Sequence, residues 1–396
     1  MLILQPAPRC RIARASHFLE DARPQGAVCA WPALRPSADP PPWLCAGLLF
    51  LLLLAVGCTS SDAPRRHTVD APLVPFNELF ALEDTIRLDP SILIGQVTFL
   101  DVNQEGHLLV SDMIGKSIYR FSASGEYVMT YSVSECLPDE KDFTPMASRF
   151  IDGDRILTMN IGGPFVVFDA AGNCLAASRR LSETFISFCA KDDSLHMLPI
   201  SGLPSGVSVA VYSAALERLG ETRVEDPEFR ELNLGRYGHP GRTLECFNDG
   251  PYYTYLGIED AIPVRANAET VRALPPFFVK RKQDLRPNLP LMEAVAEIRA
   301  YPRTIAVFGI DSLTRMIRYK GLRDKWHSDT QIAVGLSVVS NISRFPARST
   351  LFPGHPVAAG YGYLYNLGDN EPLADGEVGN PVITRYRFIP PTNSDE

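Results

Sequence analysis

Short apolar runs, separated by turns rich in glycine, asparagine and aspartate, follow one another along the chain from residue 97 onward. The first stretch, 97–132, divides into VTFLDV, NQEG, HLLVSD, MIGKS, IYRFSA, SGE and YVMTYS. β-Branched and aromatic residues favour strands, and glycine-bearing turns of this length join antiparallel neighbours. The stretch therefore predicts a four-stranded antiparallel sheet.

The same pattern recurs at a spacing of about 40–55 residues, which is typical of repeated sheets. Further units lie at 147–178, 186–224, 244–274, 296–323 and 344–389. One four-stranded unit cannot bury both of its faces alone, so the units must stack against each other. Six such units predict an all-β fold, a six-bladed β-propeller over residues 76–390, with 391–396 as a C-terminal tail.

Residues 280–303 interrupt this pattern. Leu291, Val295 and Ile298 stand near helical spacing and favour a short inserted helix. The same segment could instead be the outer strand of the fifth blade. The basic run at 280–282 is typical of a solvated loop.

A different pattern stands near the N-terminus, where residues 43–56 read WLCAGLLFLLLLAV. This run is shorter than the roughly 20 residues that a membrane-spanning helix needs, and it has the length of a signal-peptide apolar region. Gly57 and Cys58 follow it, which resembles the lipobox of bacterial lipoproteins, although Ala55 stands where that motif usually has leucine. The resemblance implies cleavage after Gly57 and lipid attachment at Cys58.

We therefore expect a signal peptide at 1–57, with an unusually long region before its apolar run, and a flexible tether at 58–75. The tether is polar, contains prolines and has no periodicity. Thr59 follows the cysteine, where aspartate would be the enterobacterial inner-membrane retention signal, so we expect the periplasmic face of the outer membrane. The alternatives are an uncleaved anchor and a buried core helix.

The net charge of the chain limits the classes of partner that we expect it to bind. The chain has 38 Lys and Arg against 46 Asp and Glu, a net charge of −8. Binding to a phosphate backbone needs a basic surface, so we expect no nucleic-acid partner. We expect contact with a membrane through the lipid, and with an envelope protein or a small-molecule ligand.

Four cysteines follow Cys58, namely Cys136, Cys174, Cys189 and Cys246. An oxidising compartment permits disulfides, and four cysteines allow three pairings. There is no CxxC motif, so neither a zinc knuckle nor a thioredoxin-like site is indicated. We expect four mostly buried thiols.

The sequence has no G-x-S-x-G, P-loop, HExxH, GxGxxG or EF-hand motif. Two loops carry candidate ligand-binding side chains, 236–255 and 352–366. These candidates are His239, Arg242, Tyr253, His355, Tyr361 and Tyr363. Tyrosine with histidine and arginine suits a sugar, peptide or aromatic ligand. Alternating tyrosines also fit one face of a strand, and His-Pro fits a turn.

The first unit resembles an NHL repeat. Asp112 takes the place of the aspartate that ends a strand in that repeat, and residues 118–121 take the place of its next strand. The repeat's Asn-His-Arg loop is Gly115-Lys116-Ser117 here, so contacts made by that loop do not carry over. The second unit keeps only the outline, at 165–169 and Gly172. Together with the lipobox, the chain resembles the bacterial six-bladed β-propeller lipoproteins.

We expect such a propeller to act as a binding platform, without a cofactor, rather than as an enzyme. The alternative is an NHL-like lactonase, other hydrolase or lyase with its site in the central channel. That chemistry needs carboxylates and asparagine converging on a metal such as Ca²⁺. The contributors considered are Asp101, Asp112, Asn160 and Asp311.

Overall fold

The structure is a computed structural model of the whole chain. The chain forms two compact units, residues 1–60 and 61–396. The residues that the structure describes all belong to the second unit. They are 65–140, 142–151, 153–160, 163–181, 183–200, 206–225, 244–254, 261–265, 269–274, 303–312, 314–322, 332–340, 345–352, 354–372 and 378–392. The expected signal peptide at 1–57, the lipidated Cys58 and the expected helix within 280–303 lie outside them.

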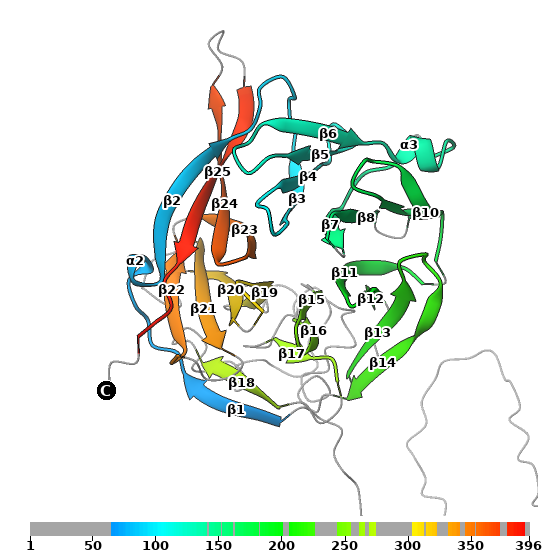
Figure 1. Cartoon of the computed structure of the whole chain (residues 1–396). Coiled ribbons are helices and arrows are strands. Elements are labelled where there is room, and N and C mark those ends of the chain that lie inside the picture. The colour runs from blue at the N-terminus through cyan, green and yellow to red at the C-terminus, as the bar shows by residue number, and fades with distance from the viewer. Residues whose placement is uncertain are drawn as a thin grey trace, which may run out of the picture. The chain divides into compact units, whose positions relative to one another are not determined.

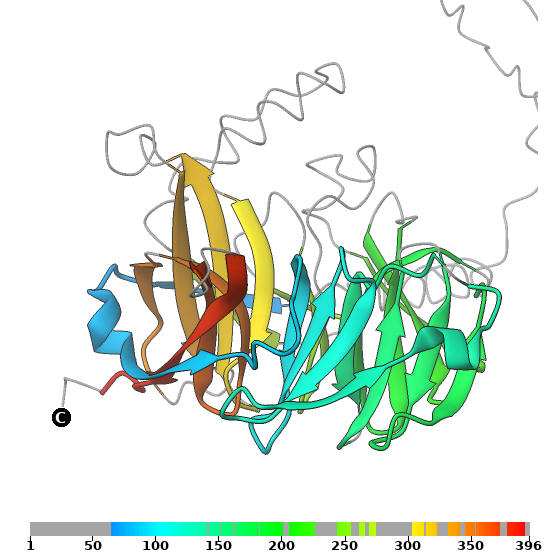
Figure 2. The ribbon, with the colours of Figure 1, turned by 90° about the horizontal axis from the view of Figure 1, so that it is seen from above.

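Six antiparallel sheets stand in a ring, which confirms the predicted six-bladed β-propeller (Figure 1). Figure 2, turned by 90°, shows the ring from its edge, and most strands run across the plane of the ring. Five of the sheets have four strands, and the fourth blade has three strands in its described part.

The first three blades follow the predicted units closely. Blade one is β3 (Val97–Val102), β4 (Leu108–Asp112), β5 (Ser117–Phe121) and β6 (Tyr127–Tyr131). Blade two is β7 (Ala147–Ile151), β8 (Arg155–Met159), β9 (Phe165–Phe168) and β10 (Cys174–Ser178). Blade three is β11 (Phe185–Lys191), β12 (Ser194–Pro199), β13 (Gly206–Ser213) and β14 (Arg218–Glu225).

The last three blades differ from the predicted boundaries. Blade four is β15 (Leu244–Phe247), β16 (Gly250–Tyr253) and β17 (Ile262–Pro263). Blade five is β19 (Arg303–Gly309), β20 (Thr314–Leu322), β21 (Ile332–Ser340) and β22 (Arg348–Phe352). Blade six is β23 (His355–Gly360), β24 (Tyr363–Pro372), β25 (Val378–Phe388) and β2 (Phe80–Arg87).

Two corrections follow. The strand at 348–352, which we placed in the sixth unit, is the outer strand of blade five, and the strand at 332–340 belonged to no predicted unit. In addition, β2 closes blade six by pairing with β25, with Phe80 opposite Phe388 and Arg87 opposite Val382. A pair of strands so far apart in the chain leaves no local pattern in the sequence.

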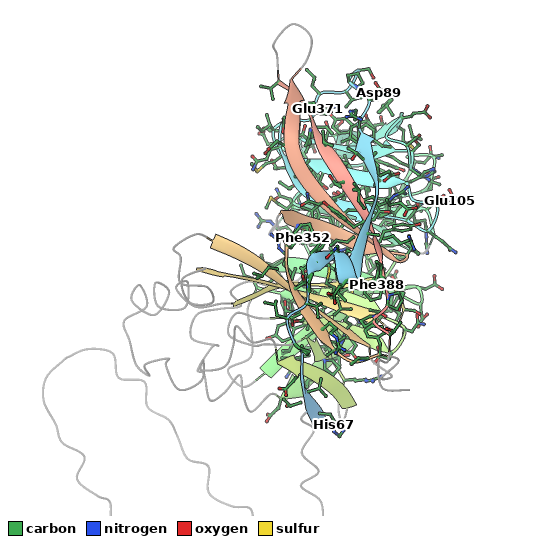
Figure 3. All side chains as sticks on the ribbon, turned by 90° about the vertical axis from the view of Figure 1, so that its left-hand side faces the viewer. His67, Asp89, Glu105, Phe352, Glu371 and Phe388 are labelled. Carbon is green, nitrogen blue, oxygen red and sulfur yellow. A yellow bond between two sulfur atoms is a disulfide. The ribbon has the colours of Figure 1, made fainter. Side chains whose placement is uncertain are left out.

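Apolar clusters fill the space between every pair of neighbouring blades. In β9, Phe165 and Val167 pack toward blade three, whereas Val166 and Phe168 pack toward blade one. Alternate residues of a strand point to opposite faces, so a strand covered on both faces is apolar throughout. An apolar cluster also fills the space between blades five and six, and it contains Phe352 and Phe388 (Figure 3).

The chain enters the propeller along its rim. Strand β1 (Arg65–Asp70) pairs in parallel with β18 (Glu269–Leu274), and helix α2 (Phe76–Leu79) leads into β2. Between them, the Val74 amide donates to the Ser349 carbonyl at 2.7 Å. The part of the expected tether that the structure describes is therefore paired to the propeller, because its backbone amides and carbonyls meet unpaired strand edges.

The four cysteines form two disulfides, Cys136–Cys174 and Cys189–Cys246. This corrects the expectation of four free thiols. The first joins helix α3 (Val133–Cys136) to β10, and the second joins β11 to β15. In both, the Cα atoms are 5.5 Å apart, within the range that a disulfide spans. The fold brings each pair together from 38 and 57 residues apart, which spacing in the sequence does not reveal.

Candidate functional site: the channel pocket

The six inner strands, β3, β7, β11, β15, β19 and β23, surround the centre of the ring, each beside the next. Their C-terminal ends, and the turns that follow, meet at one end of the central channel. There they enclose a cavity of about 990 Å³, which we call the channel pocket. Every blade contributes, through residues 101–105, 149–150 with 153–154, 189–192, 245–248, 309 with 311–312, and 359–361. The pocket thus depends on closure of the whole ring.

The lining of the channel pocket is acidic. Among the residues that the structure describes, its cations are Arg149 and Lys191. The carboxylates in the same described lining are Asp101, Glu105, Asp154, Asp192, Glu245 and Asp311. Blades one to five each supply at least one of these carboxylates, and blade six supplies Tyr361 instead. The pocket therefore favours a ligand that is not itself strongly anionic.

An ion pair crosses the channel between blades that are not neighbours. Nη1 of Arg149, on β7, lies 2.7 Å from Oε2 of Glu245, on β15. The two side chains are only 12% and 20% exposed, and the guanidinium also stacks 5.1 Å over the ring of Phe99. The partly buried pair fixes the direction of both side chains where they border the pocket.

Asp101 lies beside this pair, on β3. Its Oδ2 accepts a hydrogen bond from the Phe150 amide at 2.8 Å. Burial raises the pKa of Asp101 to about 6, Arg149 opposes that rise, and Glu245 adds to it. A carboxyl group that titrates near neutrality in a cavity can exchange a proton with a ligand.

Tyr361 closes the pocket from blade six. Gly360 pairs with Tyr363, so Tyr361 and Gly362 form a two-residue hairpin turn, and both have positive φ, at 54° and 87°. Such turns favour asparagine before glycine, and a bulky residue with positive φ is uncommon. The residue as a whole is 55% exposed, and it lines the pocket.

The phenol of Tyr361 feels the charges of two carboxyl groups in the lining of the pocket, Asp101 of the adjacent blade one and Glu245 of blade four. Burial raises its pKa, and the charges of Asp101 and Glu245 raise it further. The turn itself is held by two backbone hydrogen bonds, from the Gly362 amide to the Ile310 carbonyl at 2.7 Å and from the Phe388 amide to the Gly362 carbonyl at 2.8 Å. An aromatic ring in a strained, well-anchored turn above a cavity marks a candidate binding residue.

A partly buried network supports one side of the pocket between blades one and two. Arg120 donates through Nε to His107 Nδ1 at 3.1 Å and through Nη2 to Asp154 at 3.2 Å. The side-chain amide of Asn103 donates through Nδ2 to the same Asp154 oxygen at 2.7 Å. The guanidinium of Arg120 lies 5.7 Å from the centre of the Phe150 ring. Asn103, Phe150 and Asp154 line the pocket, so this network fixes their positions.

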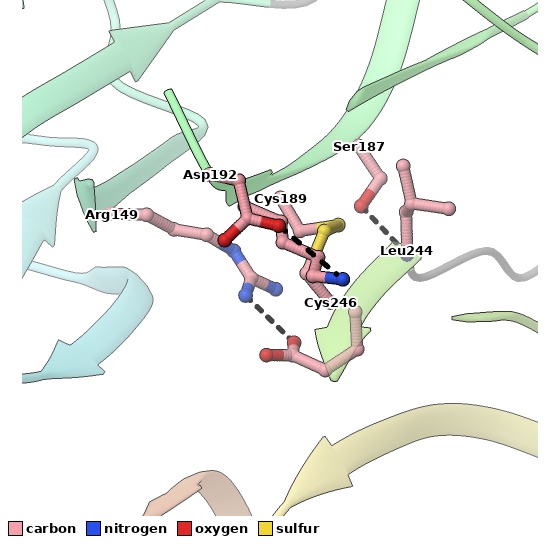
Figure 4. The surroundings of a disulfide bond; sticks show 8 residues. Arg149, Ser187, Cys189, Asp192, Leu244 and Cys246 are labelled. Carbon is pink, nitrogen blue, oxygen red and sulfur yellow. Dashed lines mark hydrogen bonds and ion pairs between the residues drawn. A yellow bond between two sulfur atoms is a disulfide. The ribbon is translucent and has the colours of Figure 1, made fainter. Parts of the chain in front are cut away.

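The Cys189–Cys246 disulfide forms part of the pocket wall between blades three and four (Figure 4). Cys246 directly follows Glu245, and the Leu244 amide donates to Ser187 Oγ of β11 at 3.0 Å. Both bonds hold β15 against β11. The position of Glu245 opposite Arg149 is thereby fixed covalently as well as by charge.

Among the six candidate ligand-binding residues, Tyr361 lines the pocket. Tyr363 instead packs below Arg385, 5.0 Å from ring to guanidinium, and Tyr253 is buried between blades three and four. His355 begins β23, but its side chain lies outside the described residues, as do His239 and Arg242. Gly57 and Cys58, the predicted cleavage and lipidation positions, are also outside them.

The carboxylates considered for a metal separate in the structure. Asp101 and Asp311 line the pocket, whereas Asp112 is buried and accepts from the amides of Gly95, Gln96 and Ile114 at 2.9, 2.8 and 3.1 Å. Asn160 does not line the pocket. Within the described ranges, no group of three or more His, Cys, Asp or Glu side chains is arranged to hold a metal ion.

Sequence reasoning missed Arg149 and Glu245. The available signal was a charged residue inside each of two strands otherwise expected to be apolar, RFID and LECF. Their pairing was not predictable, because they stand 96 residues apart on non-adjacent blades.

No family model and no curated protein matches the chain. Solved structures that it resembles include a candidate exported protein of Bacteroides fragilis and a member of the DUF4221 family from Bacteroides vulgatus. Each is 12% identical with a TM-score of 0.51, covering 81% and 80% of this chain and 99% of the other. At this identity the likeness bears on the fold alone, and it agrees with the propeller. No helix in the described residues is long and apolar enough to cross a membrane.

Proposed function

We propose that this protein is a binding platform of the bacterial cell envelope, anchored through a lipid on Cys58, whose ligand enters the channel pocket. One observation carries the proposal. Turns from all six blades converge on a cavity of about 990 Å³ that is lined by charged side chains and one exposed tyrosine. Ligand sites in proteins are concave, with a few polar groups placed to orient the ligand.

Two further points support the envelope location. The sequence around Cys58 resembles a lipobox, and one structurally similar protein carries a name that describes export. The anchor would place the propeller at the periplasmic face of the outer membrane. The resemblance of the first unit to an NHL repeat fits this proposal. Propellers of many kinds are rigid rings that carry ligand-binding sites, and the ligand depends on the site rather than on the fold.

The anchor is tested by Cys58→Ala in the full chain. We expect the unchanged chain to incorporate radiolabelled palmitate and to sediment with membranes. The variant should lose the label and be released, because an acidic protein gains no attachment from an anionic membrane surface and the acyl chains on Cys58 would have to supply it. An unchanged chain that sediments with membranes without incorporating the label would contradict lipid anchoring and favour the uncleaved anchor.

The pocket is tested by screening small molecules against the purified chain and comparing hits with Tyr361→Asn. Asparagine before glycine suits the turn, so this variant should fold while losing the ring that faces the pocket. We expect hits to weaken in this variant but not in Tyr127→Asn, where the tyrosine lies on outer strand β6. If both substitutions changed the affinity of a hit equally, the hit would bind outside the channel pocket.

A second candidate function is catalysis, which Asp101 favours. A carboxyl group with a pKa of about 6, next to a phenol and a guanidinium, has the properties of a general base. An NHL-like lactonase or other hydrolase, with or without Ca²⁺, would use it to activate water. Lactone and ester hydrolysis abolished by Asp101→Asn, with ligand binding retained, would favour the enzyme over the platform.

A further inference from the structure

The two cations of the channel pocket are already engaged by the protein. Arg149 pairs with Glu245, and Lys191 donates to the Asn248 carbonyl at 2.7 Å and lies 3.4 Å from Asp192. The positive charge of each is therefore already compensated by a partner within the protein. Asp154 is similarly paired with Arg120.

Asp101 is different. It projects into the same cavity and, within the described part of the chain, forms no ion pair; its neighbour Arg149 pairs with Glu245 instead. The cluster of Asp101, Arg149 and Glu245 thus has two carboxyl groups for one guanidinium. When both carboxyl groups are ionised, one negative charge is left without compensation at a poorly solvated position, which is costly.

The surroundings of that charge suit an organic cation. Tyr361 presents an exposed ring within electrostatic reach of Asp101 and Glu245. An ammonium or guanidinium group is attracted both by carboxylates and by the face of an aromatic ring. The remaining pocket carboxylates give the opening a negative field that raises the local concentration of cations.

We propose that the channel pocket binds a ligand through an ammonium or guanidinium group, which pairs with Asp101 and Glu245 beneath the ring of Tyr361. This inference rests on the proposed function and names the ligand class of its pocket. The cavity holds more than one such group, so the cation would be one end of a larger molecule, such as a polyamine or a basic peptide side chain.

Binding of this kind should depend on pH. The charged and titratable groups that face Asp101 are Arg149 of β7, Glu245 of β15 and Tyr361 of the turn after β23. Of these, only the carboxyl groups gain a proton on mild acidification. Binding should weaken as the pH falls below about 6, where Asp101 becomes neutral, and near that pH a proton should be released when the cation enters.

The test is calorimetric titration of the whole chain, in a non-ionic detergent at pH 7.5, with spermidine, agmatine and the peptide Gly-Lys-Gly. We expect at least one probe to bind with one site per chain. Asp101→Asn and Glu245→Gln should each weaken it about tenfold, the loss typical of one charge-assisted hydrogen bond. Asp101→Glu should retain binding.

The matched control is Asp142→Asn, which removes an equal charge from an exposed carboxylate that pairs with Lys116 on the outside. It should change binding less than twofold. Failure of all three probes to bind, an unchanged affinity in Asp101→Asn, or an equal loss in Asp142→Asn would each overturn the proposal. Binding of glutarate or a neutral sugar that is lost in Tyr361→Asn would overturn it while leaving the pocket as the ligand site.

Discussion

At the scale of single residues, Asp101 lines the candidate site, and the burial of its ionised form lowers the stability of the fold at neutral pH. Its carboxyl group faces the channel on an inner strand, and burial raises its pKa from 3.8 to about 6. Between these two values the folded chain binds more protons than the unfolded chain. The stabilisation from a protonated Asp101 is therefore complete below about pH 4 and is lost as the pH rises through about 6.

We predict that Asp101→Asn removes this dependence. At pH 3 the variant and the unchanged protein should be equally stable, because both side chains are then neutral in the folded and in the unfolded chain. At pH 7.5 the variant should be more stable by up to about 3 kcal/mol, the equivalent of the pKa shift. Urea unfolding at both pH values measures the difference.

Asp142→Asn provides a contrast of opposite sign. Lys116 lowers the pKa of Asp142, so its contribution to stability is present at neutral pH and disappears on acidification. A gain in stability at pH 7.5 in both variants would show that general charge repulsion, rather than burial of Asp101, is responsible.

At the scale of elements, short apolar runs between turn residues identified most strands, because a strand packed between two blades must be apolar on both faces. Blade two illustrates this, with FVVF and RILTM forming β9 and β8 as expected. What the pattern could not show was which elements meet. The disulfides, the Arg149–Glu245 pair and the pairing of β2 with β25 all join distant segments.

We predict that replacing Cys189 and Cys246 by alanine lowers the free energy of unfolding by roughly 2–4 kcal/mol, because the disulfide restricts the unfolded chain. Replacing Cys136 and Cys174 should cost a similar amount, since the two loops contain 57 and 38 residues. Denaturant titration under non-reducing conditions compares the two.

The two double variants should differ at the pocket. Only loss of Cys189–Cys246 frees β15, so only that variant should show faster hydrogen exchange at residues 244–247 and weaker ligand binding. Equal exchange at these amides in both variants would mean that the Arg149–Glu245 pair and the Ser187 hydrogen bond suffice to position Glu245.

At the scale of the whole molecule, the predicted ring is confirmed, but its closure was not foreseen. The sequence contains six strand-rich units, and their stacking follows from the need to cover apolar faces. The boundaries of the last three blades differ from the predicted ones, because a repeat count alone does not show where a ring begins. Tyr361 was predicted as a site residue from its chain neighbours, whereas the rest of the pocket arises only when all six blades meet.

We predict that β2 is essential to the ring. Ile86 is 3% exposed and packs between blades six and one, so Ile86→Ala should lower the free energy of unfolding by about 2–4 kcal/mol. Leu82, on the same strand, is 65% exposed, and Leu82→Ala should change it by less than about 0.5 kcal/mol. Thermal unfolding of both variants measures the contrast, and equal effects would argue against closure by β2.

The pairing of β2 with β25 also sets an order of events during biosynthesis. Residues 80–87 leave the ribosome early, yet the strand that they join is completed only at residue 388. Until then the first blade lacks one neighbour and the sixth blade does not exist, so an apolar face stays uncovered throughout elongation. The ring can therefore close only once residue 388 is available, and the channel pocket cannot form until this last strand is in place.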